Sequence, residues 1–167
     1  MSGMTQTEKD LFEAFVGEAK ATVRLKSFAD KAEQEGYPEI AKLFRAVSAA
    51  EFVHATRALR LLGIIRSTEE NLKRSFESET AVSENRYPEF IRQAEADSNN
   101  AARLAFTHAR DAEEFHAKLY KLAMSDLAAE RESVFHVCQV CGYVVDGEPP
   151  DVCPVCGARR EKFFQVN

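Results

Sequence analysis

The segment Ala50–His54, AEFVH, recurs further along the chain as Ala112–His116, AEEFH. Both segments contain Glu-x-x-His, and residues three apart lie on one face of an α-helix. Each segment therefore presents a carboxylate and an imidazole on the same side of a predicted helix. The pair predicts a repeated helical unit that carries potential metal ligands.

The offset between these two segments also superimposes positions outside them. Phe44 falls on Phe106, and Ala32 falls on Ala94. Apolar residues recur three and four apart through both copies, which is the helical period. Two similar helical hairpins that pair through equivalent inner faces form a four-helix bundle with a pseudo-two-fold axis.

Helix breakers are few from about Thr5 to Arg131. Helix boundaries are expected at Gly36 and Pro38, at Gly63, at a capping box over Ser67–Glu70, and near Ser98. Tyr87-Pro88 falls inside the third helical segment, so we expect a kink or local irregularity there. From residue 134 onward, Gly, Pro and β-branched residues around the cysteines predict short strands and tight turns. We therefore expect a bundle domain over residues 1–133 and a small metal domain over residues 134–167.

Two further glutamates lie in the apolar rows of the remaining helices. Glu18 shares its row with Phe15 and Thr22, and Glu79 shares its row with Phe76. Each precedes its Glu-x-x-His motif by nearly the same distance along the chain, so the two copies are in register. Carboxylates in an apolar core need a compensating charge, which two divalent cations supply. Oxygen and imidazole ligands suit iron or manganese. The predicted di-metal ligands are Glu18, Glu51, His54, Glu79, Glu113 and His116.

All four cysteines lie close together near the end of the chain, as Cys138-x-x-Cys141 and Cys153-x-x-Cys156. Each pair forms a tight knuckle that turns two thiolates toward one ion, so four sulfurs make a tetrahedral site. This region is too small to bury a sufficient core, and we expect metal binding to support its folding. Iron and zinc both use this spacing. Iron would make the domain an electron carrier, whereas zinc would make it a structural ribbon.

The composition limits the partners of the protein. A hydrophobic fraction of 45% and a charged fraction of 29% are typical of a soluble globular chain, and no apolar run approaches the roughly 20 residues that span a bilayer. The net charge of −5, with basic residues interspersed among acidic ones, argues against nucleic acid. The polar N-terminus lacks the apolar stretch of a signal peptide, so we expect a cytoplasmic protein whose thiols stay reduced and bind metal.

The chain resembles rubrerythrin, in which a ferritin-like di-iron bundle precedes a rubredoxin-like domain. The resemblance covers nearly the whole chain and rests on Phe15–Glu18 (FVGE), Ala50–His54, Glu79 eight residues before Tyr87–Phe90 (YPEF), Ala112–His116, and Cys-x-x-Cys-Gly-Tyr with Cys-Pro-x-Cys-Gly. It implies an all-α four-helix ferritin-like bundle followed by a rubredoxin-like domain of strands and turns. Two iron ions are then expected in the bundle and one in the four cysteines, because Gly142-Tyr143 and Pro154 are rubredoxin-type features.

The resemblance also implies an activity. Family members are non-haem di-iron peroxidases that reduce hydrogen peroxide to water in oxidative stress defence, and the six bundle ligands are then the catalytic residues. The expected electron source is an NADH-linked reductase or a rubredoxin, acting through the Fe(Cys)4 centre. A homodimer or higher homo-oligomer is expected, with the cysteine site of one subunit near the di-iron site of another. The alternatives are a ferroxidase or iron-handling protein, and a structural zinc-binding module.

Two positions depart from the family pattern. Val82 stands where the family usually has a second glutamate, three residues after Glu79, and Leu25 stands where it often has a tyrosine. We therefore expect a six-ligand site in which His54 remains bound to iron in both oxidation states. The offset between the two copies grows by one residue somewhere between Thr80 and Tyr87. A one-residue π-bulge there would instead turn Glu84 toward the site.

Overall fold

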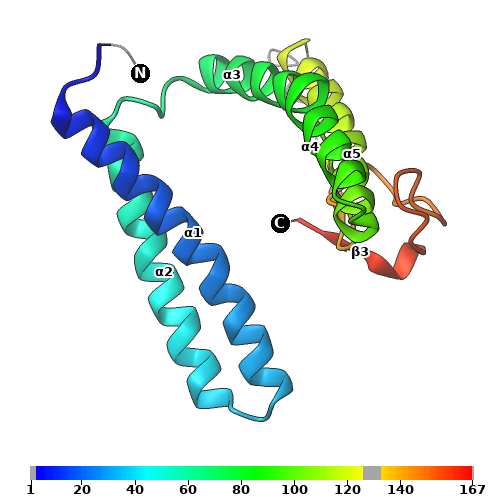
Figure 1. Ribbon diagram of the computed structural model, residues 1–167, viewed down its shortest axis with the longest axis horizontal. Helices are drawn as coiled ribbons and strands as arrows, with labels where there is room; N and C mark the ends of the chain where they lie inside the picture. Colours follow the sequence, from blue (N-terminus) through cyan, green and yellow to red (C-terminus); the bar gives the residue numbers. More distant parts are fainter. Residues whose placement is uncertain (1–2, 126–132, 167) are drawn as a thin grey trace. The chain divides into compact units, whose positions relative to one another are not determined.

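Two antiparallel helices, α1 (Gln6–Gln34) and α2 (Pro38–Leu61), form the first of two units, Met1–Arg66 (Figure 1). The computed structural model describes residues 3–125 and 133–166. A capping box starts α1, because the Glu8 amide donates to the Thr5 hydroxyl while the Glu8 carboxylate accepts from the Thr5 amide at 2.7 Å. The predicted turn at Gly36 and Pro38 is confirmed, with Gly36 at a φ of 80°.

Small side chains allow α1 and α2 to approach closely. The buried positions between them are Thr22, Ala29, Ala32, Ala41, Ser48, Ala55 and Ala58. The Ser48 hydroxyl donates to the Thr22 carbonyl at 2.9 Å, which joins the two helices halfway along the hairpin. Nearer the turn, Phe28 and Phe44 meet edge to face with their ring centroids 5.7 Å apart.

The second unit, Ser67–Asn167, begins with a second hairpin made of α3 (Thr68–Ala81), α4 (Tyr87–Ala96) and α5 (Asn100–Ser125). The predicted capping box at Ser67 is confirmed. Between α3 and α4 the chain continues as a π-helical segment, η1 (Val82–Arg86), so α3 and α4 together correspond to the third predicted helix. The expected irregularity is therefore present directly before Tyr87, and it accommodates the extra residue of the second repeat.

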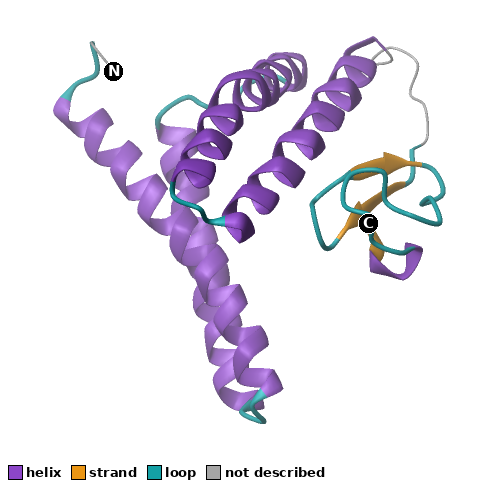
Figure 2. Cartoon of the chain, turned by 45° about the vertical axis from the view of Figure 1, so that its right-hand side comes forward, coloured by secondary structure: helices purple, strands orange, loops and turns teal. Residues whose placement is uncertain are grey.

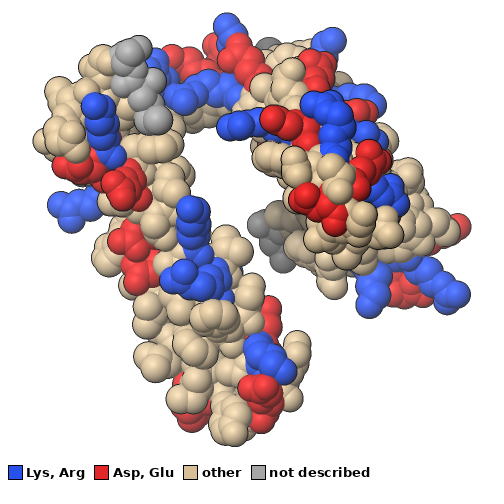
Figure 3. Space-filling view, viewed as in Figure 1, with Lys and Arg blue, Asp and Glu red and all other residues tan. Residues whose placement is uncertain are grey.

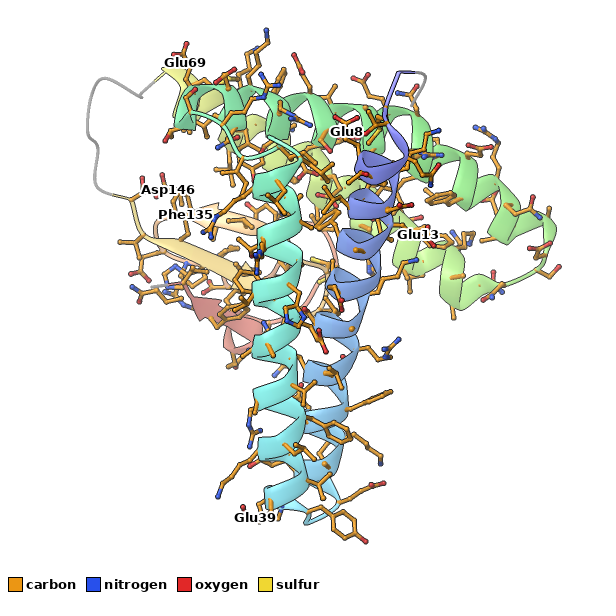
Figure 4. The ribbon with its side chains drawn as sticks, turned by 90° about the vertical axis from the view of Figure 1, so that its left-hand side faces the viewer. Glu8, Glu13, Glu39, Glu69, Phe135 and Asp146 are labelled. Carbon is orange, nitrogen blue, oxygen red and sulfur yellow. The ribbon has the colours of Figure 1, made fainter. Side chains whose placement is uncertain are left out.

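The cysteine-containing part of the second unit is a three-stranded antiparallel sheet in the order β2-β1-β3 (Figure 2). Its strands are β1 (Phe135–Cys138), β2 (Val144–Asp146) and β3 (Phe163–Gln165), and a 3-10 turn, η2 (Arg160–Lys162), precedes β3. Phe135 pairs with Asp146 across β1 and β2 (Figure 4). The proposed domain boundary at residues 133 and 134 follows directly on residues 126–132, which lie outside the described residues, and it stays a prediction.

Charged side chains of both signs are mixed on the face of each unit that Figure 3 shows. Several are paired along helices, for example Lys31 with Glu35 at 2.9 Å and Lys42 with Glu39 at 2.7 Å. Of the helices that the structure describes, none combines the length and the apolar character needed to cross a membrane.

Candidate metal centres

The first half-site consists of Glu18 from α1 with Glu51 and His54 from α2. One ligand atom from each of these three side chains lies within 4.8 Å of the others. The Nδ1 atom of His54 is 3.0 Å from Glu51 Oε2, as the i, i+3 spacing requires. Glu18 occupies the helical turn closed by Thr22, whose hydroxyl donates to the Glu18 carbonyl at 2.9 Å. Two carboxylates and one imidazole therefore face one point beside this hairpin.

The second half-site consists of Glu79 from α3 with Glu113 and His116 from α5. Its ligand atoms also lie within 4.8 Å of one another, and His116 Nδ1 is 2.7 Å from Glu113 Oε2. The two half-sites thus repeat one arrangement, in which a glutamate on one helix faces a Glu-x-x-His pair on the next. The side chain of His116 is 22% exposed, whereas that of His54 is 61% exposed. The second half-site is therefore the more enclosed of the two.

Electrostatics in the second half-site favour a bound cation. Burial raises the pKa of Glu79 to about 7, and a hydrogen bond with Glu113 and the charge of Glu113 contribute to that rise, although His116 opposes it. Two carboxylates in this position share a proton when no cation is present. A divalent ion removes that repulsion, so this donor set fits a metal such as iron.

The outer nitrogen of His116 contacts the cysteine domain of the same chain. His116 Nε2 lies 2.8 Å from the backbone carbonyl oxygen of Gly142, in the first cysteine knuckle. A metal-binding histidine commonly donates its second ring N–H to a carbonyl, which fixes the tautomer and leaves the other nitrogen free to bind the ion. This contact therefore selects Nδ1 of His116 as the metal-facing atom.

Aromatic packing supports the same contact. The ring of Phe115 meets that of Tyr143 edge to face at a centroid distance of 4.8 Å, and Tyr143 in turn meets Phe163 at 6.3 Å. A mostly apolar pocket of about 400 Å³ borders His116 and is lined by residues of α3, α5, β1 and β2. The resemblance implies proximity of the two metal centres between subunits. Here the cysteine domain packs against the second half-site of its own chain.

Four thiols form the third centre. Cys138 Sγ lies 3.7 Å from Cys156 Sγ, and Cys141 Sγ lies 3.6 Å from Cys153 Sγ. These distances are too long for a disulfide, which needs about 2.05 Å. They match the edges of a tetrahedron with arms of about 2.3 Å, the usual metal–sulfur distance. The four sulfurs are therefore already arranged to bind one metal ion.

The two cysteine knuckles have the same backbone hydrogen bonds. Gly142 N donates to Cys138 O at 2.9 Å, and Gly157 N donates to Cys153 O at 3.0 Å. Both glycines have positive φ values, 80° and 72°, which other residues rarely adopt. Burial alone would raise the pKa of the Cys138 thiol, but hydrogen bonds from backbone N–H groups and neighbouring thiols hold it below its ordinary value. Burial raises the pKa of Cys156, so the thiols share protons until a cation replaces them.

Glu84 does not supply the carboxylate that is missing at Val82. The π-helical segment is present, yet Glu84 is exposed and lines a pocket with Lys118 and Lys121 on α5. It is absent from the group of ligand atoms around Glu79 among the described residues. The π-helical segment therefore does not bring a third carboxylate to the second half-site in this conformation.

The contact between His116 and Gly142 could not be predicted from the sequence. The ligand motifs specify which residues face a metal, but they contain no information about what lies beyond the second ring nitrogen. One signal was available in the repeat, because Phe115 stands where the first copy has Val53. That replacement gives the second copy an aromatic side chain with which to bind the cysteine domain.

Comparisons with known proteins identify the family of both the helical part and the cysteine-containing part of the chain. Residues 9–124 match the Rubrerythrin family model, and residues 136–164 match the model of the rubrerythrin rubredoxin-like domain. Nigerythrin of Nitratidesulfovibrio vulgaris is 33% identical over 94% of this chain and 85% of its own length. Rubrerythrin of Porphyromonas gingivalis is 31% identical over 96% of this chain and 90% of its own.

Solved structures agree with the sequence comparisons. Two structures of nigerythrin, one described as partially reduced and one as fully reduced and all ferrous, each match with a TM-score of 0.59 and 31% identity. Each match covers 99% of this chain and 89% of the nigerythrin chain. These matches support a ferritin-like bundle with a rubredoxin-like domain, as the sequence predicted. The chain carries the residues of a di-iron carboxylate site and of a four-cysteine rubredoxin-like site, and it belongs to the rubrerythrin family of oxidoreductases.

Proposed function

We propose that this protein is a peroxidase that reduces hydrogen peroxide to water at a di-iron site, with electrons delivered through its Fe(Cys)4 centre. The observation that carries the proposal is the contact between His116 and the Gly142 carbonyl. It joins a ligand of the two-metal site to a residue adjoining Cys141, which is a ligand of the one-electron centre. A redox enzyme needs such a connection, whereas an iron store or a structural zinc protein does not.

Each half-site offers one ion a defined set of donors. Glu51 and His54, with Glu18, form the first set, and the second set is equivalent. Bound iron supplies the redox chemistry, since two ferrous ions together provide the two electrons that hydrogen peroxide needs, with two protons, to form two water molecules. The glutamates neutralise the cations, and the histidines fix their positions.

Tyr87 belongs to the surroundings of the second half-site, because the charges of Glu113 and Glu79 act on its phenol. Burial raises the pKa of its phenol, and the charges of Glu113 and Glu79 raise it further. The phenol therefore keeps its proton at neutral pH and remains a donor to an oxygen-bearing substrate. Tyr87 is also fixed by its edge-to-face contact with Phe90, at 6.0 Å between centroids.

The cysteine domain acts as the electron inlet. Iron held by the four cysteines would accept electrons one at a time from a reductase or a rubredoxin that takes them from NADH. The Gly142 carbonyl, next to Cys141, and the N–H of His116 would connect that centre to the second half-site. Because carrier and site belong to one chain, their mutual encounter does not depend on protein concentration.

The experiment is steady-state peroxide reduction by iron-loaded protein with an NADH-driven rubredoxin reductase system. We expect one NADH to be consumed for each peroxide. We also expect this activity to be lost when only the bundle iron is removed. NADH oxidation that does not depend on peroxide would contradict the proposal.

Iron oxidation is a second candidate because of two specific residues. Val82 and Leu25 leave the site with six ligands and without the tyrosine that the family often has. A ferroxidase would use dioxygen and excess Fe(II) and would accumulate ferric iron. Comparing the rates with dioxygen and with peroxide as oxidant decides between the two activities.

A further inference from the structure

Neither helical hairpin contains a core of large side chains. Among the described residues, the largest that are fully buried are Cys138, Cys153 and Ser48, and two of these belong to the cysteine domain. The buried positions of α1 and α2 are otherwise alanines and one threonine. Amphipathic helices bury their apolar faces against a further layer, so each hairpin needs a partner.

An exposed apolar row runs along α2 and includes a ligand of the first half-site. Ile40, Val47, His54 and Leu61 follow one another at intervals of seven, which keeps them on one side of the helix. Ile40 is 47% exposed, Val47 37% and Leu61 65%, and the side chain of His54 is 61% exposed. The surface that covers this row must therefore also complete a metal site.

The second half-site has the chemistry that such a surface requires. Two ions bound between four carboxylates and two imidazoles need a second glutamate and Glu-x-x-His set opposite the first. Glu79, Glu113 and His116 form that set on the α3–α5 hairpin. The occupant of the exposed α2 face is therefore an α3–α5 hairpin, from this chain or from a second copy.

The connection between the hairpins is short. Only residues 62–67 lie between the last residue of α2 and the first of α3. Part of this length closes the end of α2, because Gly63 N donates to Arg60 O and Ile64 N donates to Leu59 O, both at 3.0 Å. Even fully extended, this connection spans at most about 25 Å between the two helix ends.

A ferritin-like bundle within one chain needs a longer connection. That fold has one long crossover between its two hairpins, so the second and third helices run parallel. Glu51 lies about 15 Å before the end of α2, and Glu79 lies about 16 Å after the start of α3, at the helical rise of about 1.5 Å per residue. To place both glutamates at the same height along the bundle axis, the crossover must run about 31 Å along that axis. It must also cross a helix spacing of about 8–10 Å perpendicular to it. The connection over residues 62–67 spans at most about 25 Å, so it is too short for this crossover.

We propose that two copies of this chain exchange hairpins, so that α1 and α2 of one copy form a bundle with α3–α5 of the other. Each di-iron site is then shared, with the first half-site from one copy and the second half-site from its partner. The cysteine domain stays on the α5 of its own chain. The inference rests on the di-metal residues of the family and not on peroxide reduction, and its tests measure mass and metal.

Mixed dimers provide the decisive test. One variant carries Glu51→Ala with His54→Ala, the other carries Glu113→Ala with His116→Ala, and differently tagged copies are co-expressed, purified as heterodimers and loaded with Fe(II). With exchanged hairpins, one bundle of the heterodimer receives both damaged half-sites and the other receives two intact ones. Mössbauer spectra of the oxidised sample are then expected to show half the wild-type content of coupled iron pairs. Each variant alone is expected to show no pairs, while the absorption of the cysteine centre confirms that it is folded.

Lengthening the connection gives an independent test. Insertion of about 20 Gly and Ser residues after Ile64 gives the connection a mean span of about 28 Å and allows much longer extensions, which permits closure within one chain. Light scattering is expected to give a dimer of the 18.7 kDa wild-type chain and monomers for this variant, with iron pairs retained. The same insertion at Gly36 leaves the α2–α3 connection short and is expected to remain dimeric. A wild-type monomer with complete iron pairs, or a heterodimer without coupled pairs, would overturn the proposal.

Discussion

Replacing Phe115 by alanine is expected to slow electron transfer from the cysteine centre to the bundle while leaving both centres loaded. Phe115 lies on α5 directly before His116, and its ring packs edge to face on Tyr143. Tyr143 is 9% exposed and forms the core of the cysteine domain with Cys138 and Cys153. The substitution therefore removes packing between the domain and α5 without changing a metal ligand.

The burial of Phe115 sets how much packing free energy the substitution removes and how far the electron-transfer rate falls. Complete truncation of a buried phenylalanine costs about 3–5 kcal/mol, and Phe115 is partly exposed, so roughly half of this, about 2 kcal/mol, is lost. The edge-to-face contact accounts for about 0.5–1.5 kcal/mol of that loss. A weakening of about 2 kcal/mol shifts the docking equilibrium about 30-fold toward the undocked state. The electron-transfer rate is expected to fall by up to the same factor.

Stopped-flow absorbance measures this rate directly. Fully reduced protein is mixed with hydrogen peroxide, and the return of the oxidised Fe(Cys)4 absorption is followed. Phe164→Ala is the matched control, because Phe164 lies in the same domain but is 46% exposed. An unchanged rate in Phe115→Ala protein with full iron content would refute the role of this contact in electron transfer.

Four further outcomes are expected. Glu51→Ala abolishes peroxide turnover but leaves the Fe(Cys)4 spectrum intact, as steady-state kinetics and absorbance would show. Deletion of residues 134–167 leaves helical protein whose bundle iron is oxidised by added peroxide but is not reduced again through the reductase chain. Crystal structures of the oxidised and reduced iron forms show His54 bound in both, and iron bound by Glu84 in either state would disprove the six-ligand site. Because the pKa of Glu79 is raised to about 7, chiefly by burial, metal binding releases a proton below that pH. Co(II) titrations are then expected to show affinity rising up to about pH 7, and Glu79→Gln reduces that slope.

Much of the fold could be predicted because its signals are local. Periodic apolar residues, the capping box at Ser67 and the turn at Gly36 each depend on neighbouring residues, and all three are confirmed. The break in the repeat before Tyr87 also predicted where an extra residue would disturb the helix, and η1 lies there. The ligand groups were predicted from spacing and from the apolar rows of the helices, and the structure brings together the residues of each triad and the four cysteines. Their roles as metal ligands and catalytic residues remain proposals.

The features of the fold and the site that could not be predicted depend on contacts between segments far apart in the chain. The hydrogen bond between His116 and Gly142 joins residues that are far apart in the chain, and the motif of neither residue specifies the other as its partner. The direction of Glu84 was equally open, since a π-helical segment can turn that side chain to more than one side. The short connection between α2 and α3 was visible in the sequence, but its consequence appears only when both half-sites are located on their helices.

The measurement that tests the central claim most directly is a single-turnover titration of the iron-loaded, fully reduced protein with hydrogen peroxide under anaerobic conditions. The proposed peroxidase consumes two electrons per peroxide, first from the bundle iron pair, and the cysteine centre is then oxidised by electron transfer to the bundle. Glu51→Ala protein serves as the control that lacks the bundle reaction. Fast oxidation by dioxygen with little oxidation by peroxide, or oxidation of the cysteine centre at the same rate in the Glu51→Ala control, would contradict this account.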